Sequence, residues 1–259
     1  MAWFDIGVNL LDSRFDPAEI IHNAEQQGVS RLCVITTHPD EWELAADLYT
    51  KFPDRLCYTV GVHPHNAKSM RPEHWPELRQ RASAPGVVAI GECGLDYNRD
   101  FSPRDVQRDV FEQQLKLAGE LGMPVYLHER DAFDDQITLL DSHLDSIPAG
   151  VLHCFTAGRI ELEQYVKRGL YIGVTGWVCD DKRGEALRDA VPAIPIERLL
   201  LETDAPYLFP KTLRPRKRNN EPAYLPHIAT EVAKLRGMAQ NELREVSYRN
   251  ACRLFGLNE

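Results

Sequence analysis

Three histidines and two acidic residues follow apolar, β-branched runs of the sequence. The runs LCYTVGV, VVAIG, PVYL, GVLH and RLLLE lead to His63, Glu92, His128, His153 and Asp204. Imidazole and carboxylate groups bind Zn²⁺ and other first-row divalent ions, and carboxylates with water suit Mg²⁺ and Mn²⁺. The spacing is long and irregular. These side chains can therefore share an ion only if the fold brings the ends of the runs together.

Eight apolar runs alternate with polar, helix-like stretches such as 105–121 and 159–168. Strands that alternate with helices indicate right-handed βαβ units and a parallel sheet. Eight units predict an α/β protein in which residues 1–259 form one (β/α)8 TIM barrel, with the metal site at the C-terminal ends of its strands. An open doubly wound sheet is the alternative. It favours a GxGxxG turn after the first strand, where this chain has GVNLLD.

Two-residue spacings suggest which roles the site residues have. Glu202 and Asp204 are two apart, so we expect them on the same side of the last strand, and His63 and His65 have the same spacing. One carboxylate can bind metal or accept a proton while the other orients water. We expect Gly94 to leave room for ion and substrate. A single histidine is more often a hydrogen-bonded interior residue, and an interior ion pair is the structural alternative for Glu202.

Composition narrows the class of protein. The chain has 259 residues, of which 43% are hydrophobic, and its net charge is −9, unlike a general nucleic-acid coat protein. No apolar run approaches the ~18 residues of a membrane span, and the N-terminus does not resemble a signal peptide. Six cysteines without a CxxC pair indicate reduced thiols. We therefore expect a cytoplasmic protein without membrane contact, and a monomer by default.

One segment departs from the acidic balance. KTLRPRKRNNEP, directly after the last run, carries five basic residues: Lys211, Arg214, Arg216, Lys217 and Arg218. Such a cluster can guide a phosphate chain toward a metal, or it can be a solvated loop. Arg130 can contact phosphate or pair with Asp131. Trp177 and Phe155 can stack on bases or belong to the core.

Several segments together resemble the TatD family of metal-dependent deoxyribonucleases, a branch of the amidohydrolase-like TIM barrels. They are GVHPH, IGECGLDY, LHERD, LHCFT, YIGVTGW, LLLETDAPYL, NEPAYLPHI and NACRLFGL. The resemblance implies that Glu92, His128 and His153 bind metal and that Asp204 is a ligand or the base for the attacking water. It makes Glu202 and His63 supporting catalytic residues.

The chain departs from the family where most members carry an HxH pair after the first strand. Gly7 and Asn9 stand at those positions, in the DIGVNL start that one branch of the family, including its enterobacterial members, shares. We therefore expect one strong ion site and a weak second position near Asp204. The loss of two imidazoles favours Mg²⁺, with Mn²⁺ and Zn²⁺ also accepted.

The resemblance implies a 3′→5′ exonuclease on single-stranded DNA and RNA, in DNA repair or turnover. The expected chemistry is metal-assisted phosphodiester hydrolysis, in which Asp204 accepts the proton of water and His63 either contacts the phosphate or protonates the leaving 3′ oxygen. His65, Arg130 and Arg218 are expected to bind substrate. The alternatives are an amidohydrolase or aminoacyl-tRNA ester hydrolase on the same barrel, and a non-catalytic binding protein. Three acids kept together without a cation would repel one another, which argues against the last alternative.

Overall fold

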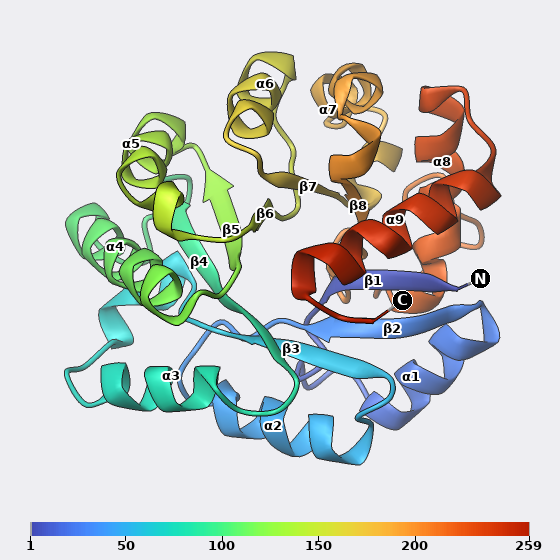
Figure 1. Cartoon of the computed structure of the whole chain (residues 1–259). Coiled ribbons are helices and arrows are strands. Elements are labelled where there is room, and N and C mark those ends of the chain that lie inside the picture. Colours follow the sequence, from blue (N-terminus) through green and yellow to red (C-terminus); the bar gives the residue numbers. More distant parts are fainter. Residues whose placement is uncertain (1, 259) are drawn as a thin grey trace. The chain divides into compact units, whose positions relative to one another are not determined.

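The computed structural model describes residues 2–258 and contains eight strands that alternate with helices (Figure 1). The chain divides into two compact units. The central unit is Ile35–Leu152, and the terminal unit combines the chain up to Val34 with the chain from His153 onward. No helix within 2–258 is long and apolar enough to cross a membrane. The prediction that residues 1–259 form one domain stays a prediction.

The central unit is a parallel sheet of four strands in sequence order. Its strands are β3 (Leu56–Val60), β4 (Val87–Asp96), β5 (Val125–Arg130) and β6 (Gly150–Leu152). Its helices are α2 (Glu41–Lys51), α3 (His74–Ala82), α4 (Arg104–Leu121) and α5 (Phe133–His143), with 3-10 turns η1 (Pro64–Ser69) and η2 (Leu144–Ser146). Helix α4 ends where Gly122 adopts the left-handed conformation, which glycine accepts without steric cost.

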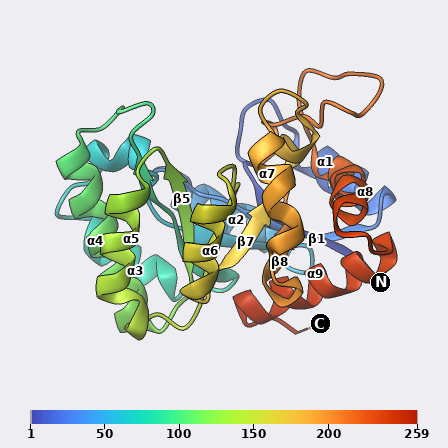
Figure 2. The ribbon, with the colours of Figure 1, turned by 90° about the horizontal axis from the view of Figure 1, so that it is seen from above.

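The terminal unit holds the other four strands. They are β1 (Trp3–Val8), β2 (Val29–Val34), β7 (Tyr171–Val174) and β8 (Leu199–Leu201). Its helices are α1 (Pro17–Gln26), α6 (Arg159–Lys167), α7 (Glu185–Ala190), α8 (Leu225–Arg236) and α9 (Gln240–Phe255). Its 3-10 turns are η3 (Gly176–Cys179), η4 (Val191–Ala193), η5 (Ile196–Arg198) and η6 (Pro222–Tyr224). The connection after β8, orange in Figure 2, extends beyond α1 and α8.

The first and last strands are neighbours in the terminal unit. β1 pairs with β2 in parallel, β7 pairs with β8, and Val8 forms a parallel bridge with Ala205 just after β8. Asp204 N donates to Gly7 O at 2.9 Å and Asn9 N donates to Ala205 O at 2.8 Å. An eight-stranded sheet in sequence order whose last strand meets its first is a barrel rather than an open doubly wound sheet. The predicted (β/α)8 class is confirmed.

Two predicted strand boundaries are wrong. β4 does not end at Gly91 but runs through Glu92 to Asp96, and its register with β5 shifts between Gly91 and Cys93. β8 ends at Leu201, so Glu202 and Asp204 follow the strand. The same-side prediction for these two acids is therefore wrong, because Asp204 has a positive φ of 53° and breaks the two-residue alternation. Such a φ is uncommon for a residue other than glycine and is enriched at functional sites.

Candidate metal centre

Three of the predicted site residues meet in the central unit. His128 Nδ1 lies 3.0 Å from Glu92 Oε1, and His63 Nε2 lies 3.4 Å from the same oxygen. One potential ligand atom from each residue falls within 4.8 Å of the others. Glu92 is buried at 5% exposure, and a buried carboxylate requires a cation or hydrogen-bond donors. A carboxylate beside an imidazole offers donor types that a first-row divalent ion accepts, so Glu92 and His128 fit a metal.

Asp96 contacts the far side of the His128 ring. Its Oδ2 lies 3.3 Å from His128 Nε2 and 2.7 Å from His65 Nε2, and its Oδ1 accepts the backbone N–H groups of Asn98 and Arg99. Burial raises the pKa of Asp96, but the hydrogen bonds from His128, His65 and Arg99 outweigh it and hold that pKa well below its usual range. A charged Asp96 favours a proton on His128 Nε2. The Nδ1 lone pair then faces Glu92, in the carboxylate–histidine arrangement that orients metal ligands.

His63 is held in a different tautomer. Its Nδ1 accepts the backbone N–H of His65 at 3.1 Å, so a neutral ring carries its proton on Nε2, the atom that faces Glu92. This assignment rests on the hydrogen-bond partners. Burial lowers the pKa of His63 to about 4, so the ring is neutral at pH 7. An Nε2–H donor suits proton transfer better than metal ligation, which agrees with the supporting position expected for His63.

His153 and Glu202 form a buried pair in the terminal unit. His153 Nδ1 lies 3.2 Å from Glu202 Oε2, and Cys154 N donates to Glu202 Oε1 at 2.5 Å. Glu202 has no exposed surface, and a Cβ atom at Gly173 would lie 2.3 Å from its Oε1. A carboxylate enclosed in this way orients the His153 ring and does not itself reach solvent. Glu202 therefore has the geometry of a positioning residue.

Asp204 lies beside the first strand. Its Oδ1 accepts a hydrogen bond from Asn9 Nδ2 at 3.0 Å, and Asn9 Nδ2 also lies 3.3 Å from Ala205 O. Asp5, two residues before Gly7, accepts hydrogen bonds from Gly7 N, Thr203 N and the Thr203 hydroxyl. Asn9 thus supplies a hydrogen-bond donor to the Asp204 carboxylate.

The sequence reasoning missed Asp96 and two exposed aromatic rings. Phe101 is 51% exposed and its ring centroid lies 4.7 Å from that of His65, while Tyr207 is 49% exposed with the Arg14 guanidinium 4.7 Å above its ring. The sequence feature that could have pointed to Asp96 is its place at the end of the GLD stretch of β4, shortly after Glu92. Phe155, expected as a stacking surface or core residue, is 3% exposed and belongs to the core.

The structure also shows where Arg130, Arg218 and Gly94 lie, three residues that the sequence analysis singled out. Arg130 is exposed and makes no ion pair among residues 2–258, and Asp131 accepts a hydrogen bond from Asn98 instead. Arg218 is also exposed. Gly94 is small for another reason than the expected one, since a Cβ there would lie 1.9 Å from His128 O. The glycine lets β5 approach β4 and does not make room for an ion.

A sequence model of the TatD related DNase family matches residues 4–256. The chain belongs to the TatD related DNase family. This TatD-family chain is 48% identical to the protein named 3'-5' ssDNA/RNA exonuclease TatD of Citrobacter rodentium, over 98% of each chain. It is also 48% identical to the protein of that name in Erwinia tasmaniensis, over 98% of this chain and 100% of the other. The predicted family is confirmed.

Solved structures support the same assignment. A TatD homologue from Escherichia coli K12 is 27% identical to this TatD-family chain, with a TM-score of 0.91 over 99% of this chain and 98% of the other. A TatD family hydrolase from Entamoeba histolytica is 26% identical, with a TM-score of 0.89 over 98% of each chain. These likenesses extend over the full (β/α)8 fold.

Proposed function

We propose that this chain is a metal-dependent 3′→5′ exonuclease that hydrolyses single-stranded DNA and RNA to mononucleotides, in DNA repair or turnover. The names of the two relatives at 48% identity support this substrate class and polarity. The observation that carries the proposal is the contact of Glu92 with His128 Nδ1. On the other side of the same ring, Asp96 Oδ2 contacts His128 Nε2. A monomer in the cytoplasm and Mg²⁺ as the native ion are parts of the same proposal.

Glu92 and His128 would hold the ion, with His153 and Asp204 as the further ligands predicted from the sequence. When bound, a divalent ion polarises the phosphoryl group and lowers the pKa of water. Asp204, held by Asn9, accepts the proton of the attacking water. His63 offers its Nε2–H to the leaving 3′ oxygen of the preceding nucleotide. His65, Arg130 and Arg218 stay predicted substrate contacts.

The proposal is tested with single-stranded DNA and RNA oligonucleotides labelled at the 3′ or the 5′ end. The EDTA-treated protein is assayed alone and with Mg²⁺, Mn²⁺ or Zn²⁺. We expect metal-dependent release of labelled mononucleotide from the 3′ label and a descending ladder from the 5′ label. Glu92→Ala abolishes both, whereas Glu77→Ala, in a surface pair with Arg81 on α3, retains both. A folded protein that cleaves neither strand with any of the three metals contradicts the proposal.

A further inference from the structure

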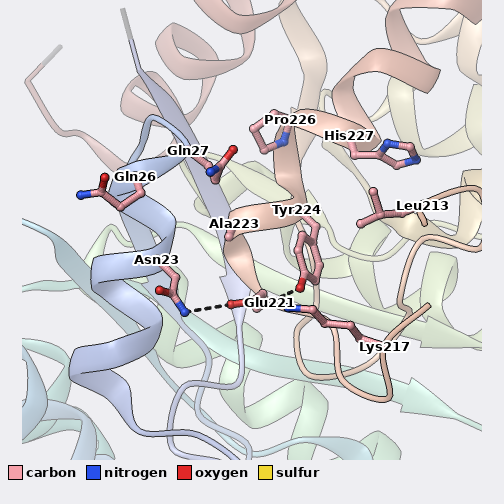
Figure 3. Close-up of a pocket in the computed structure, with 10 residues that line it drawn as sticks. All are labelled: Asn23, Gln26, Gln27, Leu213, Lys217, Glu221, Ala223, Tyr224, Pro226 and His227. Carbon is pink, nitrogen blue, oxygen red and sulfur yellow. Dashed lines mark hydrogen bonds and ion pairs between the residues drawn. The ribbon is translucent and has the colours of Figure 1, made fainter. Parts of the chain in front are cut away.

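A pocket of about 510 Å³ opens in the terminal unit between α1 and the connection from β8 to α8 (Figure 3). Helix α1 contributes the side-chain amides of Asn23 and Gln26, and the residue that follows the helix contributes that of Gln27. Lys217 comes from the basic segment, and Tyr224 and His227 come from η6 and the start of α8. The volume lies within the range of ordinary ligand sites, roughly 300–1,000 Å³. The pocket belongs to the same unit as Asp204, and none of its lining residues is assigned to the metal.

The negative charge of Glu221, the acidic residue in this pocket, is already compensated by neighbouring hydrogen-bond donors and a lysine. Glu221 accepts hydrogen bonds from the Tyr224 hydroxyl and from Asn23 Nδ2, the latter at 3.3 Å, and Lys217 Nζ lies 3.3 Å from its Oε1 (Figure 3). Lys217 Nζ also lies 5.3 Å from the centroid of the Tyr224 ring. A carboxylate with three donors exerts little repulsion on an incoming anion. The pocket can therefore accept a phosphate-bearing ligand despite Glu221.

The segment that borders the pocket is strongly basic and is tied to Asp204. The segment between Ala205 and Pro222 contains the five basic residues and a single acidic residue, Glu221. Arg216 and Arg218 are exposed and form no ion pair with any residue in 2–258. Asn220 Nδ2 donates to Thr203 O at 2.9 Å, so the segment returns to the residue next to Asp204. A polyanion with one end at Asp204 would meet these cations.

We propose that this pocket is an auxiliary subsite that holds a nucleotide of single-stranded nucleic acid, on the 5′ side of the phosphodiester to be cleaved. The inference rests on the proposed nuclease function. The Gln26 and Gln27 amides form no side-chain hydrogen bond within the described chain, so they can pair with base edges. Pro226 and the Tyr224 ring offer flat apolar contact, and Lys217 is the lining residue that can bind phosphate. The stacking and phosphate contacts tolerate any base, as a degradative exonuclease requires.

The test compares a 12-nucleotide strand with a 3-nucleotide strand, which has few nucleotides on the 5′ side of the phosphodiester to be cleaved. Fluorescence anisotropy in EDTA measures binding without cleavage, and kcat/KM is measured with Mg²⁺. In Gln27→Ala and Lys217→Gln we expect affinity for the 12-mer to fall about tenfold and hydrolysis of the 3-mer to stay unchanged. Lys116→Gln is the matched control, because Lys116 also pairs with a glutamate four residues away and lines a groove of about 490 Å³.

Equal loss for both lengths, or no loss for the 12-mer, overturns the subsite. Thermal melting verifies that each variant is folded. Failure of the proposed function would look different, because the wild type would then cleave neither strand with any metal. The anisotropy measurement would still report whether the long strand binds through Gln27 and Lys217.

Discussion

The Asn9 side-chain amide donates to Asp204 Oδ1 at 3.0 Å and also lies 3.3 Å from Ala205 O. Two acceptors around one nitrogen determine the orientation of the amide, since a flipped group would place its oxygen against both. Most family members are expected to have a histidine at this position. In this chain a neutral hydrogen-bond donor holds the carboxylate of Asp204.

Replacing that donor by an acid should make the protein depend on metal. In Asn9→Asp two carboxylates would face each other at about 3 Å, and like charges at that distance disfavour joint ionisation. We expect a lower melting temperature than wild type in EDTA and a larger rise on addition of Mn²⁺. Asn9→Ala, which adds no charge, should show the loss without the enhanced rise. Equal metal responses in Asn9→Asp and wild type would contradict this account.

Asp96→Asn should weaken metal binding without touching a predicted ligand. The amide can still accept the N–H groups of Asn98 and Arg99, but it no longer favours the Nε2 proton of His128. Loss of such an outer carboxylate typically reduces metal affinity 10–100-fold. Isothermal titration with Mn²⁺ measures the change. His65→Ala is the control, since it removes the other ring on Asp96 and leaves the His128 contact in place; unchanged affinity in Asp96→Asn would refute the assignment.

Gly94→Ala should be far more damaging than the same change at Gly122. Both glycines have positive φ, 138° and 63°, but a Cβ at Gly94 would lie 1.9 Å from His128 O, whereas Gly122 has nothing within 4 Å. We expect Gly122→Ala to cost about 1 kcal/mol of unfolding free energy. Gly94→Ala should cost about 3 kcal/mol or more and remove activity, because β5 must shift. Urea unfolding compares the two variants, and similar midpoints would count against the close strand contact.

Asp5 should lower stability as the pH rises. Burial raises the pKa of this carboxyl from 3.8 to about 7, more than its hydrogen bonds from Thr203 and Gly7 lower it. Between about pH 4 and pH 7 the folded chain holds a proton that the unfolded chain has released. The stabilisation of the folded chain by this proton is complete below pH 4 and is lost as the pH rises through 7. It amounts to on the order of 4 kcal/mol of unfolding free energy.

The Asp5→Asn variant isolates this contribution. Its amide oxygen can accept the same backbone N–H groups and its nitrogen can donate to the Thr203 hydroxyl, with no proton to lose. Urea unfolding of both proteins at pH 5, 6, 7 and 8 gives the difference in free energy. We expect that difference to shift in favour of Asp5→Asn from pH 5 to pH 7 and to level off by pH 8. Parallel pH profiles would show that Asp5 does not titrate in this window.

Local sequence patterns were enough to predict the fold class and two of the helices. The 105–121 stretch corresponds to α4 (Arg104–Leu121) and 159–168 to α6 (Arg159–Lys167). These elements were predictable because apolar periodicity and helix stop signals act over a few residues. The family motifs predicted Glu92, His128 and His153 as metal ligands and His63 as a supporting residue, and the structure brings Glu92, His128 and His63 together.

The chain order by itself determined which residues stand near strand ends, but only the tertiary structure decided which atoms meet. The pairing of Asp96 with His128 depends on the shifted register of β4 against β5, a contact between segments 32 residues apart. Asp204 meets Asn9 because the last strand lies beside the first. Neither contact has a local signature, since hydrogen-bond direction and burial arise only when distant segments pack. The roles of Asp96, Asn9 and Glu202 follow from that packing.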